Sequence, residues 1–250
     1  MDVTKRLQKL DPTLKLSSES KWDEPDVAKK GYHSFNDAGV EIEVGEFLYS
    51  MVRVLKPANV LETGTHWGIG ASYMGQALKD NGEGHLDTIE FLPEIASRAT
   101  KRILDLDLTA QVTIHLTDAR AFNPPEDWRG SNESAQMAGL DQPTCKYDLI
   151  LLDTEPQTRF EELIRFFDFL TPGGFVFIHD LHRHMHQIPN EEHGFAWPFG
   201  KIPETIKQWV KRDRLRPFHF PTPRGFTGFY KPNPKDYQWN NTRQSDNNIT

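Results

Sequence analysis

The 250-residue sequence contains a single cysteine, Cys145. One cysteine excludes an internal disulfide and any metal site built from several thiolates, and it fits a reducing compartment. The sequence has no apolar run long enough to span a membrane, and its polar start MDVTKRLQKL lacks the apolar core of a secretory signal. Basic residues are outnumbered, with 29 Lys and Arg against 36 Asp and Glu and a pI near 5.8, which argues against a broad surface for nucleic acid. We therefore expect a cytoplasmic protein that binds neither a membrane nor nucleic acid.

The polarity of the chain divides it into three parts. Residues 1–40 are polar and charged, which predicts an N-terminal arm or a lid, because so hydrophilic a segment cannot hold a core of its own. Residues 41–231 carry the periodic apolar patterns of one domain, and residues 232–250 are polar enough to predict a disordered tail. The arm contains Tyr32, His33 and Phe35, which either fold over a ligand or anchor the arm by packing. We favour packing.

Short apolar runs alternate with stretches of helical spacing from residue 41 onward. Strands are predicted at 60–62, 85–90, 112–116, 147–152, 175–178, 215–220 and 225–230, and helices at 41–55, 71–78, 93–106, 160–170 and 204–211. Alternation of this kind predicts an α/β fold, a Rossmann-like doubly wound sheet of about seven mostly parallel strands. The last two strands are separated only by Pro-Thr-Pro-Arg and must form a C-terminal antiparallel hairpin.

A glycine-rich turn joins the first predicted strand to its helix, in the stretch ANVLETGTHWGIGASYMGQALK at 58–79. Glycine allows close approach of a ligand to the backbone, and the helix start offers unpaired N–H groups, so the turn suits a nucleotide-like ligand. The dinucleotide fingerprint G-x-G-x-x-G is not met, because His66 stands at its second glycine. Glu62 precedes Gly64 by two residues, and a carboxylate there favours a cationic ligand over a pyrophosphate.

Acidic residues follow the first five predicted strands. They are Glu62, Glu90, Asp118, Asp153 and Asp180. One acid after a strand is ordinary turn chemistry, but five in register are harder to explain in that way. Ligands of open α/β sheets bind outside the carboxyl ends of the strands, so we expect these acids to surround one pocket.

The pattern Glu62-x-Gly64-x-x-x-Gly68 resembles motif I of the class I S-adenosylmethionine (SAM)-dependent methyltransferases, whose ligand carries a sulfonium and an ammonium. The resemblance extends over roughly residues 41–231, since the sheet of that family also ends with a reversed seventh strand beside the sixth. It implies that Glu90 accepts hydrogen bonds from the ribose hydroxyls and that Asp118 and Ala119 lie at the adenine amino group. Ser72 either donates to the SAM carboxylate or caps its own helix. The implied SAM-binding residues are Glu62, Gly64, Thr65, His66, Gly68, Ser72, Glu90, Asp118, Ala119 and Asp153.

Asp153 and Asp180 end adjacent central strands and resemble the acids of the metal-dependent small-molecule O-methyltransferases. The resemblance implies a divalent cation such as Mg²⁺, held by Asp153, His179 and Asp180, that would lower the pKa of a substrate hydroxyl. The sequence departs from that family at Leu181, which cannot ligate a metal. A second departure is Pro156, which stands where catechol-type enzymes place a lysine.

A general base is also expected near the transferred methyl group. Our candidates for catalytic residues are Asp153, His182 and His184, because an unperturbed histidine titrates near neutral pH. His182 and His184 would otherwise be exposed loop residues.

The function expected from these features is transfer of a methyl group from SAM to a hydroxyl of a small molecule, a sugar or a natural product, with or without a divalent cation. Methylation of nitrogen or of a carboxyl group by the same fold is the first alternative. A nucleotide-dependent oxidoreductase and a SAM-binding protein without catalysis remain open. The expected partner is a small-molecule acceptor, and a homo-oligomer is compatible with the sequence.

Overall fold

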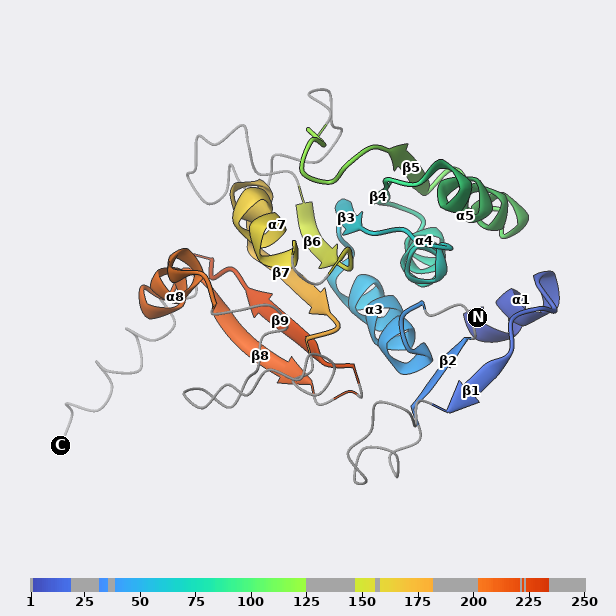
Figure 1. Ribbon diagram of the computed structural model, residues 1–250, viewed down its shortest axis with the longest axis horizontal. Coiled ribbons are helices and arrows are strands. Elements are labelled where there is room, and N and C mark those ends of the chain that lie inside the picture. The colour runs from blue at the N-terminus through green and yellow to red at the C-terminus, as the bar shows by residue number, and fades with distance from the viewer. Residues whose placement is uncertain are drawn as a thin grey trace.

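The computed structural model describes residues 2–18, 32–35, 39–124, 147–155, 158–181, 202–220, 222 and 224–233. These residues contain a seven-stranded sheet in the order β5-β4-β3-β6-β7-β9-β8 (Figure 1). The strands are β3 (Asn59–Thr63), β4 (His85–Glu90), β5 (Val112–Leu116), β6 (Tyr147–Leu152), β7 (Leu170–His179), β8 (Arg216–Phe220) and β9 (Phe226–Tyr230). Strands β3 to β7 pair in parallel, whereas β9 lies antiparallel between β7 and β8. The predicted fold class, including its C-terminal hairpin, is confirmed.

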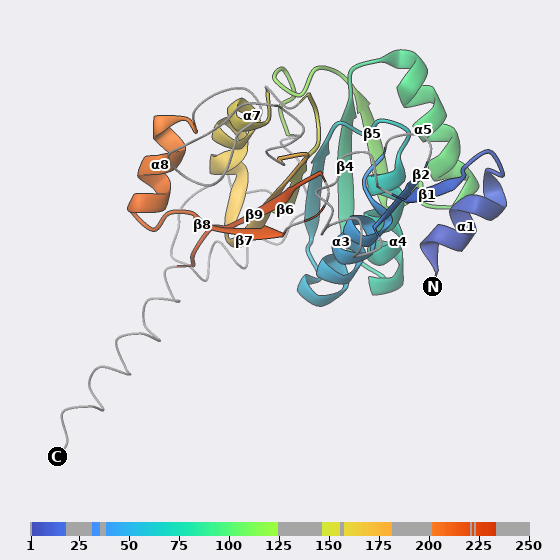
Figure 2. The ribbon, with the colours of Figure 1, turned by 60° about the horizontal axis from the view of Figure 1, so that its bottom comes forward.

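Helices cover both faces of this sheet (Figure 2). On one face lie α3 (Ile42–Leu55), α4 (Ile69–Asn81) and α5 (Pro93–Asp105), and on the other α7 (Arg159–Phe166) and α8 (Glu204–Lys211). Successive residues of a strand point to opposite faces, so Val60 packs into the first core and Leu61 into the second. Strand β3 therefore contributes an apolar side chain to each of the two cores, as buried parallel strands do.

The ends of the helices follow local rules. Pro93 occupies the first turn of α5, where its missing N–H costs nothing. Helix α4 ends at Gly82, which adopts a left-handed φ of 77° and donates its N–H to the carbonyl of Leu78. Because these signals are local, the predicted bounds of α4 and α5 are close to those observed.

Strand β7 starts five residues before its predicted start at Phe175, since it runs from Leu170 to His179. The helix before it is shorter than expected, because α7 ends at Phe166 and a 3₁₀ turn spans Phe167–Phe169. The register of β6 on β7 is irregular between Tyr147 and Leu149. Gly174 fits this irregularity, because a Cβ there would lie 2.9 Å from the carbonyl oxygen of Asp148.

The N-terminal segment contains three elements that the sequence patterns did not predict. They are α1 (Val3–Leu10) and a two-stranded antiparallel pair of β1 (Leu16–Ser18) and β2 (His33–Phe35). Val3, Leu7 and Phe35 are buried in the first core, and the hydroxyl oxygens of Thr4 and Tyr73 lie 2.6 Å apart. Residues 2–18 thus pack onto α4. In the described part of the chain, no helix is both long and apolar enough to cross a membrane.

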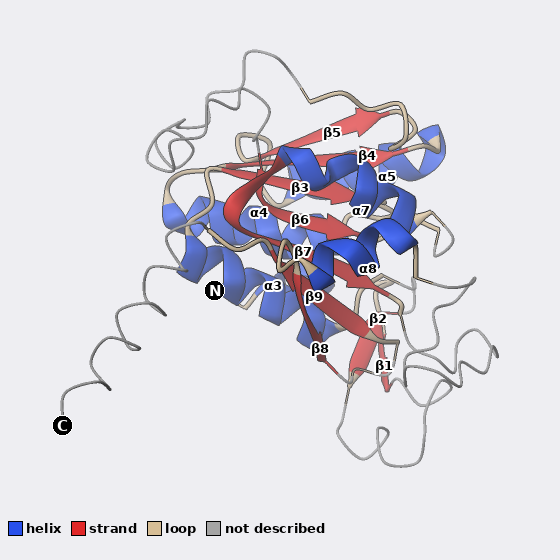
Figure 3. Ribbon diagram, turned by 90° about the vertical axis from the view of Figure 1, so that its left-hand side faces the viewer, coloured by secondary structure: helices blue, strands red, loops and turns tan. Residues whose placement is uncertain are grey.

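Figure 3 shows the strands side by side, with the arrowheads of β3 to β7 pointing the same way, so that their carboxyl ends lie at one edge of the sheet. The turn after β3, the residues after β4 and β5, and the ends of β6 and β7 all meet there. This edge carries the candidate site.

Candidate functional site

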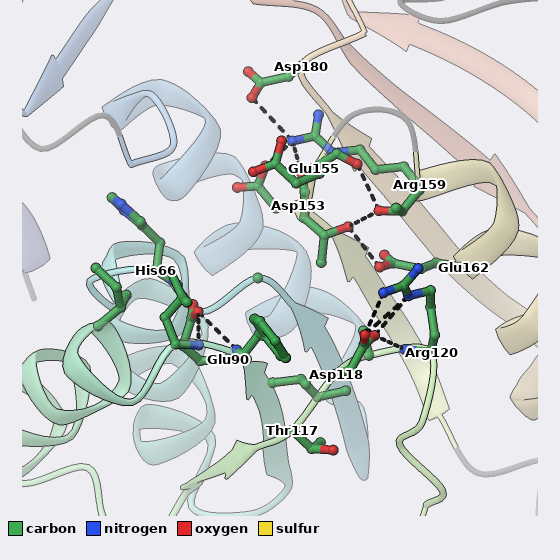
Figure 4. A pocket seen from close by; sticks show the side chains of 18 of the residues that line it. His66, Glu90, Thr117, Asp118, Arg120, Asp153, Glu155, Arg159, Glu162 and Asp180 are labelled. Carbon is green, nitrogen blue, oxygen red and sulfur yellow. Dashed lines mark hydrogen bonds and ion pairs between the residues drawn. The ribbon is translucent and has the colours of Figure 1, made fainter.

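A pocket of about 580 Å³ opens at the carboxyl ends of the parallel strands (Figure 4). Its volume is within the range of small-molecule sites. Predicted site residues that line it are Gly64, His66, Glu90, Asp118, Ala119, Asp153 and Asp180. Glu62, Thr65, Ser72 and His179 are buried beside it. Gly68 adopts a left-handed φ of 79° at the start of α4. Four of the five strand-end acids, Glu90, Asp118, Asp153 and Asp180, therefore line one hollow, whereas the fifth, Glu62, is buried and does not line it.

In the glycine turn after β3, position 64 has room only for glycine. Gly64 has a φ of 81°, and a Cβ on it would lie 2.3 Å from the carbonyl oxygen of Asp153. Only glycine fits so close to the backbone that follows β6. The turn thereby brings the end of β3 and the end of β6 into contact at the floor of the pocket.

Glu62 lies beneath the turn and has 2% of its surface exposed. Its carboxylate accepts a hydrogen bond of 2.5 Å from Thr88, and a Cβ on Gly70 in the first turn of α4 would lie 2.3 Å from its Oε1. Burial raises the pKa of Glu62 to about 8, and the negative charges of Asp153 and Glu90 act in the same direction. A positive charge bound above Glu62 would relieve this unfavourable situation.

Glu90 is the last residue of β4, and its carboxylate joins the turn after β3 to the residues that follow β4. Its carboxylate accepts backbone N–H groups of His66 at 2.8 Å and of Phe91 and Leu92 at 2.9 Å. The carboxylate is thus fixed in orientation at the wall of the pocket. Carboxylate oxygens have lone pairs beyond those that three N–H groups use, so Glu90 can also accept from a ligand.

Ser72 and Asp118 also have partners within the protein. Ser72 donates its hydroxyl to the carbonyl of Gly68 at 2.5 Å, a bond inside the first turn that does not cap α4, whose N-cap is Gly68. Asp118 pairs with Arg120, whose Nη2 lies 2.6 Å from Oδ2. Hydrogen bonds from the Arg120 side chain and backbone hold the pKa of Asp118 below its usual value.

Six charged side chains meet at the ends of β6 and β7, and we call them the ionic cluster. They are Glu41, Asp153, Arg159, His179, Asp180 and Arg224. His179 is completely buried, with Nδ1 3.0 Å from Asp153 Oδ1 and Nε2 2.5 Å from Glu41 Oε2. Arg159 Nη2 lies 3.2 Å from Asp153 Oδ1 and 3.3 Å from Asp180 Oδ2.

The charges of the cluster compensate one another. Burial alone would lower the pKa of His179, but the negative charges of Asp180, Asp153 and Glu41 outweigh it and raise this pKa to about 10. Burial would raise the pKa of Asp180, yet the charges of His179, Arg224 and Arg159 hold it well below its usual value. Asp180 also has a left-handed φ of 55°, which aspartate tolerates better than most residues.

Four residues of this region were not predicted from the sequence: Glu41, Arg159, Glu162 and Arg224. Glu162 lines the pocket and accepts hydrogen bonds from Thr63 at 2.7 Å and from Thr154 at 2.8 Å. One signal was present, because Arg159 and Glu162 stand on the apolar face of α7 with Leu163 and Phe166. A charged pair at buried helical positions points to a polar site. Glu41 and Arg224 offered no local signal.

His182 and His184, the histidines predicted as candidate bases, lie outside the described residues. So does Pro156. Asp153 remains as the candidate base that the structure describes, and it borders the pocket.

In this doubly wound sheet the last strand in sequence is reversed and lies between the two strands that precede it. Together with a pocket above a glycine turn, this arrangement is that of the class I SAM-dependent methyltransferase fold. Residues 61–181, just under half of the chain, match the family model of a methyltransferase domain. This match confirms the resemblance to the class I SAM-dependent methyltransferases that was drawn from the sequence.

Relatives of known sequence or structure point the same way. A catechol O-methyltransferase of Niastella koreensis is 34% identical over 96 residues, which is 36% of this chain and 42% of that protein. The chain thus spans about two fifths of the length of the curated relative that it matches.

Among solved structures, the O-methyltransferase TomG of Streptomyces achromogenes, in complex with SAM, has a TM-score of 0.62 at 18% identity, covering 92% of this chain and 89% of that one. A putative O-methyltransferase of Klebsiella pneumoniae has a TM-score of 0.58 at 19% identity, covering 78% and 82%. An O-methyltransferase of Bacillus cereus, bound to S-adenosylhomocysteine (SAH), has 0.55 at 18%, covering 77% and 83%. At these identities the likeness establishes the fold.

Proposed function

We propose that this protein transfers a methyl group from SAM to a hydroxyl of a small molecule. The observation that carries the proposal is the acidic floor of the pocket, where buried Glu62 lies under the glycine turn and Glu90 stands at the end of the next strand. Two acidic side chains so close to the turn suit a sulfonium and an ammonium, because a bound positive charge favours the ionised form of Glu62, and they disfavour a pyrophosphate.

The cofactor lies across the carboxyl ends of β3, β4 and β5 in this proposal. Gly64, Thr65, His66 and Gly68 surround its methionine part above Glu62. Glu90 accepts hydrogen bonds from its ribose hydroxyls, and Asp118 and Ala119 lie near the adenine. The lining by Gly64, His66, Glu90, Asp118 and Ala119 supports this orientation.

The chemistry asks little of the protein beyond alignment and removal of one proton. The sulfonium of SAM is an activated donor, so placing the acceptor oxygen in line with the methyl group supplies much of the rate. The acceptor proton passes to a base, for which Asp153, His182 and His184 are the candidates. Asp153 borders the pocket at the end of β6, beside the turn that holds the methionine part.

The acceptor is a small molecule, and a sugar or natural product is our first choice. Methylation of a nitrogen or of a carboxyl group would use the same alignment and remains the alternative reaction. A nucleotide-dependent oxidoreductase is disfavoured, because His66 replaces the glycine that a pyrophosphate requires and has a φ of 48°. A cytoplasmic location is retained as part of the proposal, with a homo-oligomer compatible with it.

A divalent cation would be held by Asp153, His179 and Asp180, whose candidate ligand atoms lie within 4.8 Å of one another. Asp180 Oδ1 accepts no hydrogen bond from the residues that the structure describes, which alone would suit a cation. However, Arg224 Nε lies 2.7 Å from this oxygen, and Arg159 already bridges the two carboxylates. The arrangement of these side chains therefore does not fit Mg²⁺, and no step of the reaction is assigned to a metal.

Calorimetry with SAM, SAH and NAD tests the proposal. We expect binding of SAM and SAH in the micromolar range and none of NAD. Preference for NAD would refute it. Methyl transfer from labelled SAM to a panel of alcohols, amines and carboxylic acids then separates oxygen from nitrogen and carboxyl acceptors, and SAM binding without any transfer would indicate a binding protein.

A further inference from the structure

Arg159 contacts all three residues of the candidate metal triad. Its Nη2 lies 3.2 Å from Asp153 Oδ1 and 3.3 Å from Asp180 Oδ2, and its Nη1 donates to the carbonyl of His179. Its Nε donates to the carbonyl of Thr154 at 2.8 Å. With 3% of its side chain exposed, this guanidinium lies between the carboxylates that a cation would join (Figure 4).

Arg224 adds a second guanidinium from the turn before β9. It contacts both oxygens of Asp180, with Nε 2.7 Å from Oδ1 and Nη2 2.9 Å from Oδ2. Its Nη1 donates to the carbonyl of Gly39 at 2.7 Å. A paired contact of this kind fixes the carboxylate in one orientation, and it leaves little of Asp180 for coordination.

His179 offers no lone pair toward the triad. Its Nε2 faces Glu41 Oε2 at 2.5 Å, and its Nδ1 faces Asp153 Oδ1 at 3.0 Å. Both ring nitrogens therefore point at carboxylate oxygens, which accept hydrogen bonds and do not donate them when ionised. A metal ligand at Nδ1 would have to break the contact with Asp153.

The positive and negative charges of the ionic cluster also balance one another. Three carboxylates, Glu41, Asp153 and Asp180, stand against two guanidinium groups and the imidazole of His179. Adding a divalent cation to this buried group would leave it strongly positive, and uncompensated charge in a poorly solvated site is costly.

We propose that Arg159, supported by Arg224, takes the position of the divalent cation, so that this pocket works with a built-in organic cation and without a metal. Arg159 is a positioning residue, since it holds Asp153 and Asp180 and has its three nitrogens occupied. A guanidinium so engaged cannot chelate two substrate oxygens as a metal does. The acceptor therefore needs only one hydroxyl at the reacting position and no adjacent oxygen, a conclusion that rests on the proposed function.

Binding of Mn²⁺, read from the electron paramagnetic resonance signal of the free ion, tests the inference in the SAH complex of the full chain. We expect no stoichiometric Mn²⁺ binding by the unchanged protein below millimolar concentration. We expect Arg159→Ala, which exposes two carboxylates, to bind Mn²⁺ at least tenfold more tightly, and Arg159→Lys, which keeps the positive charge, to behave as the unchanged protein does.

The matched control is Arg120→Ala, which releases only the single carboxylate of Asp118 and should gain no Mn²⁺ site. Stoichiometric micromolar Mn²⁺ binding by the unchanged protein that is lost in Asp180→Asn would overturn the inference, and so would equal affinities in Arg159→Ala and the unchanged protein. Should Arg159→Ala not fold, the titration of the unchanged protein decides alone.

Methyl transfer to a monohydroxy acceptor and to its vicinal diol, each with and without EDTA, tests the conclusion about the acceptor. We expect both to be methylated at rates within a few-fold of each other in EDTA, and a strict requirement for the diol and for a metal would refute this. Failure of SAH to bind would instead refute the proposed function while leaving the Mn²⁺ comparison intact.

Discussion

Replacing Glu90 with alanine should weaken SAM binding more than any other single change at the cofactor end of the pocket. The carboxylate is held by three backbone N–H groups, and in the proposed complex its remaining lone pair accepts from the ribose hydroxyls. A hydrogen bond to a charged group contributes about 1.5–3 kcal/mol, so losing this contact weakens binding by up to about 3 kcal/mol. This corresponds to an increase of up to about 100-fold in Kd.

Calorimetric titration with SAH measures this change directly. Glu94→Ala is the matched control, because Glu94 is an exposed acid on the next turn of the chain that does not line the pocket. Glu90→Gln provides a second variant of the same size, and thermal unfolding shows whether each variant folds. An unchanged Kd in folded Glu90→Ala would mean that Glu90 only closes its turn and that the cofactor lies elsewhere.

Two further changes test the floor of the pocket. Gly64→Ala should destabilise the protein by clearly more than Gly82→Ala. Both glycines have a positive φ. A Cβ on Gly64 would lie 2.3 Å from the backbone carbonyl oxygen of Asp153, whereas a Cβ on Gly82 would have no described atom within 4 Å. The Gly82 change then measures the backbone strain alone, about 1 kcal/mol, by urea unfolding, and equal losses would contradict the close approach. Glu62→Gln should flatten the pH dependence of stability without SAM. The folded-state pKa of Glu62 is raised to about 8 from 4.5, so its contribution is fully present below pH 4.5 and is lost as pH rises through 8. The loss is about 5 kcal/mol, and parallel stability curves for the two proteins would show that Glu62 titrates normally.

Much of the fold could be predicted from local pattern. The predicted bounds of β5 and β6 agree with those observed, because an apolar run with turn signals on both sides is recorded in the residues themselves. The secondary structure of the N-terminal arm was harder to predict. The apolar face of α1 carries only Val3 and Leu7 into the core, too few for its periodicity to stand out among charged neighbours.

The acids of the site were found and most of their partners were not. Position after a strand is a local property, and it singled out Asp153 and Asp180. Pairing is a property of the folded chain, since His179 meets Glu41 from 138 residues away and Arg224 meets Asp180 across 44 residues. No spacing rule reaches so far. The predicted metal site was drawn from the carboxylates alone, because the sequence does not show that the guanidinium groups of Arg159 and Arg224 lie beside them.

The origin of Arg224, just before the last strand of the sheet, bears on how the protein is made. A ribosome releases the chain from its N-terminal end, so Asp180 emerges well before the side chain that grips both its oxygens. Until the closing hairpin is synthesised and docks, Asp180 lacks the guanidinium that contacts both its oxygens. Docking of the hairpin therefore completes the charge balance at the end of β7.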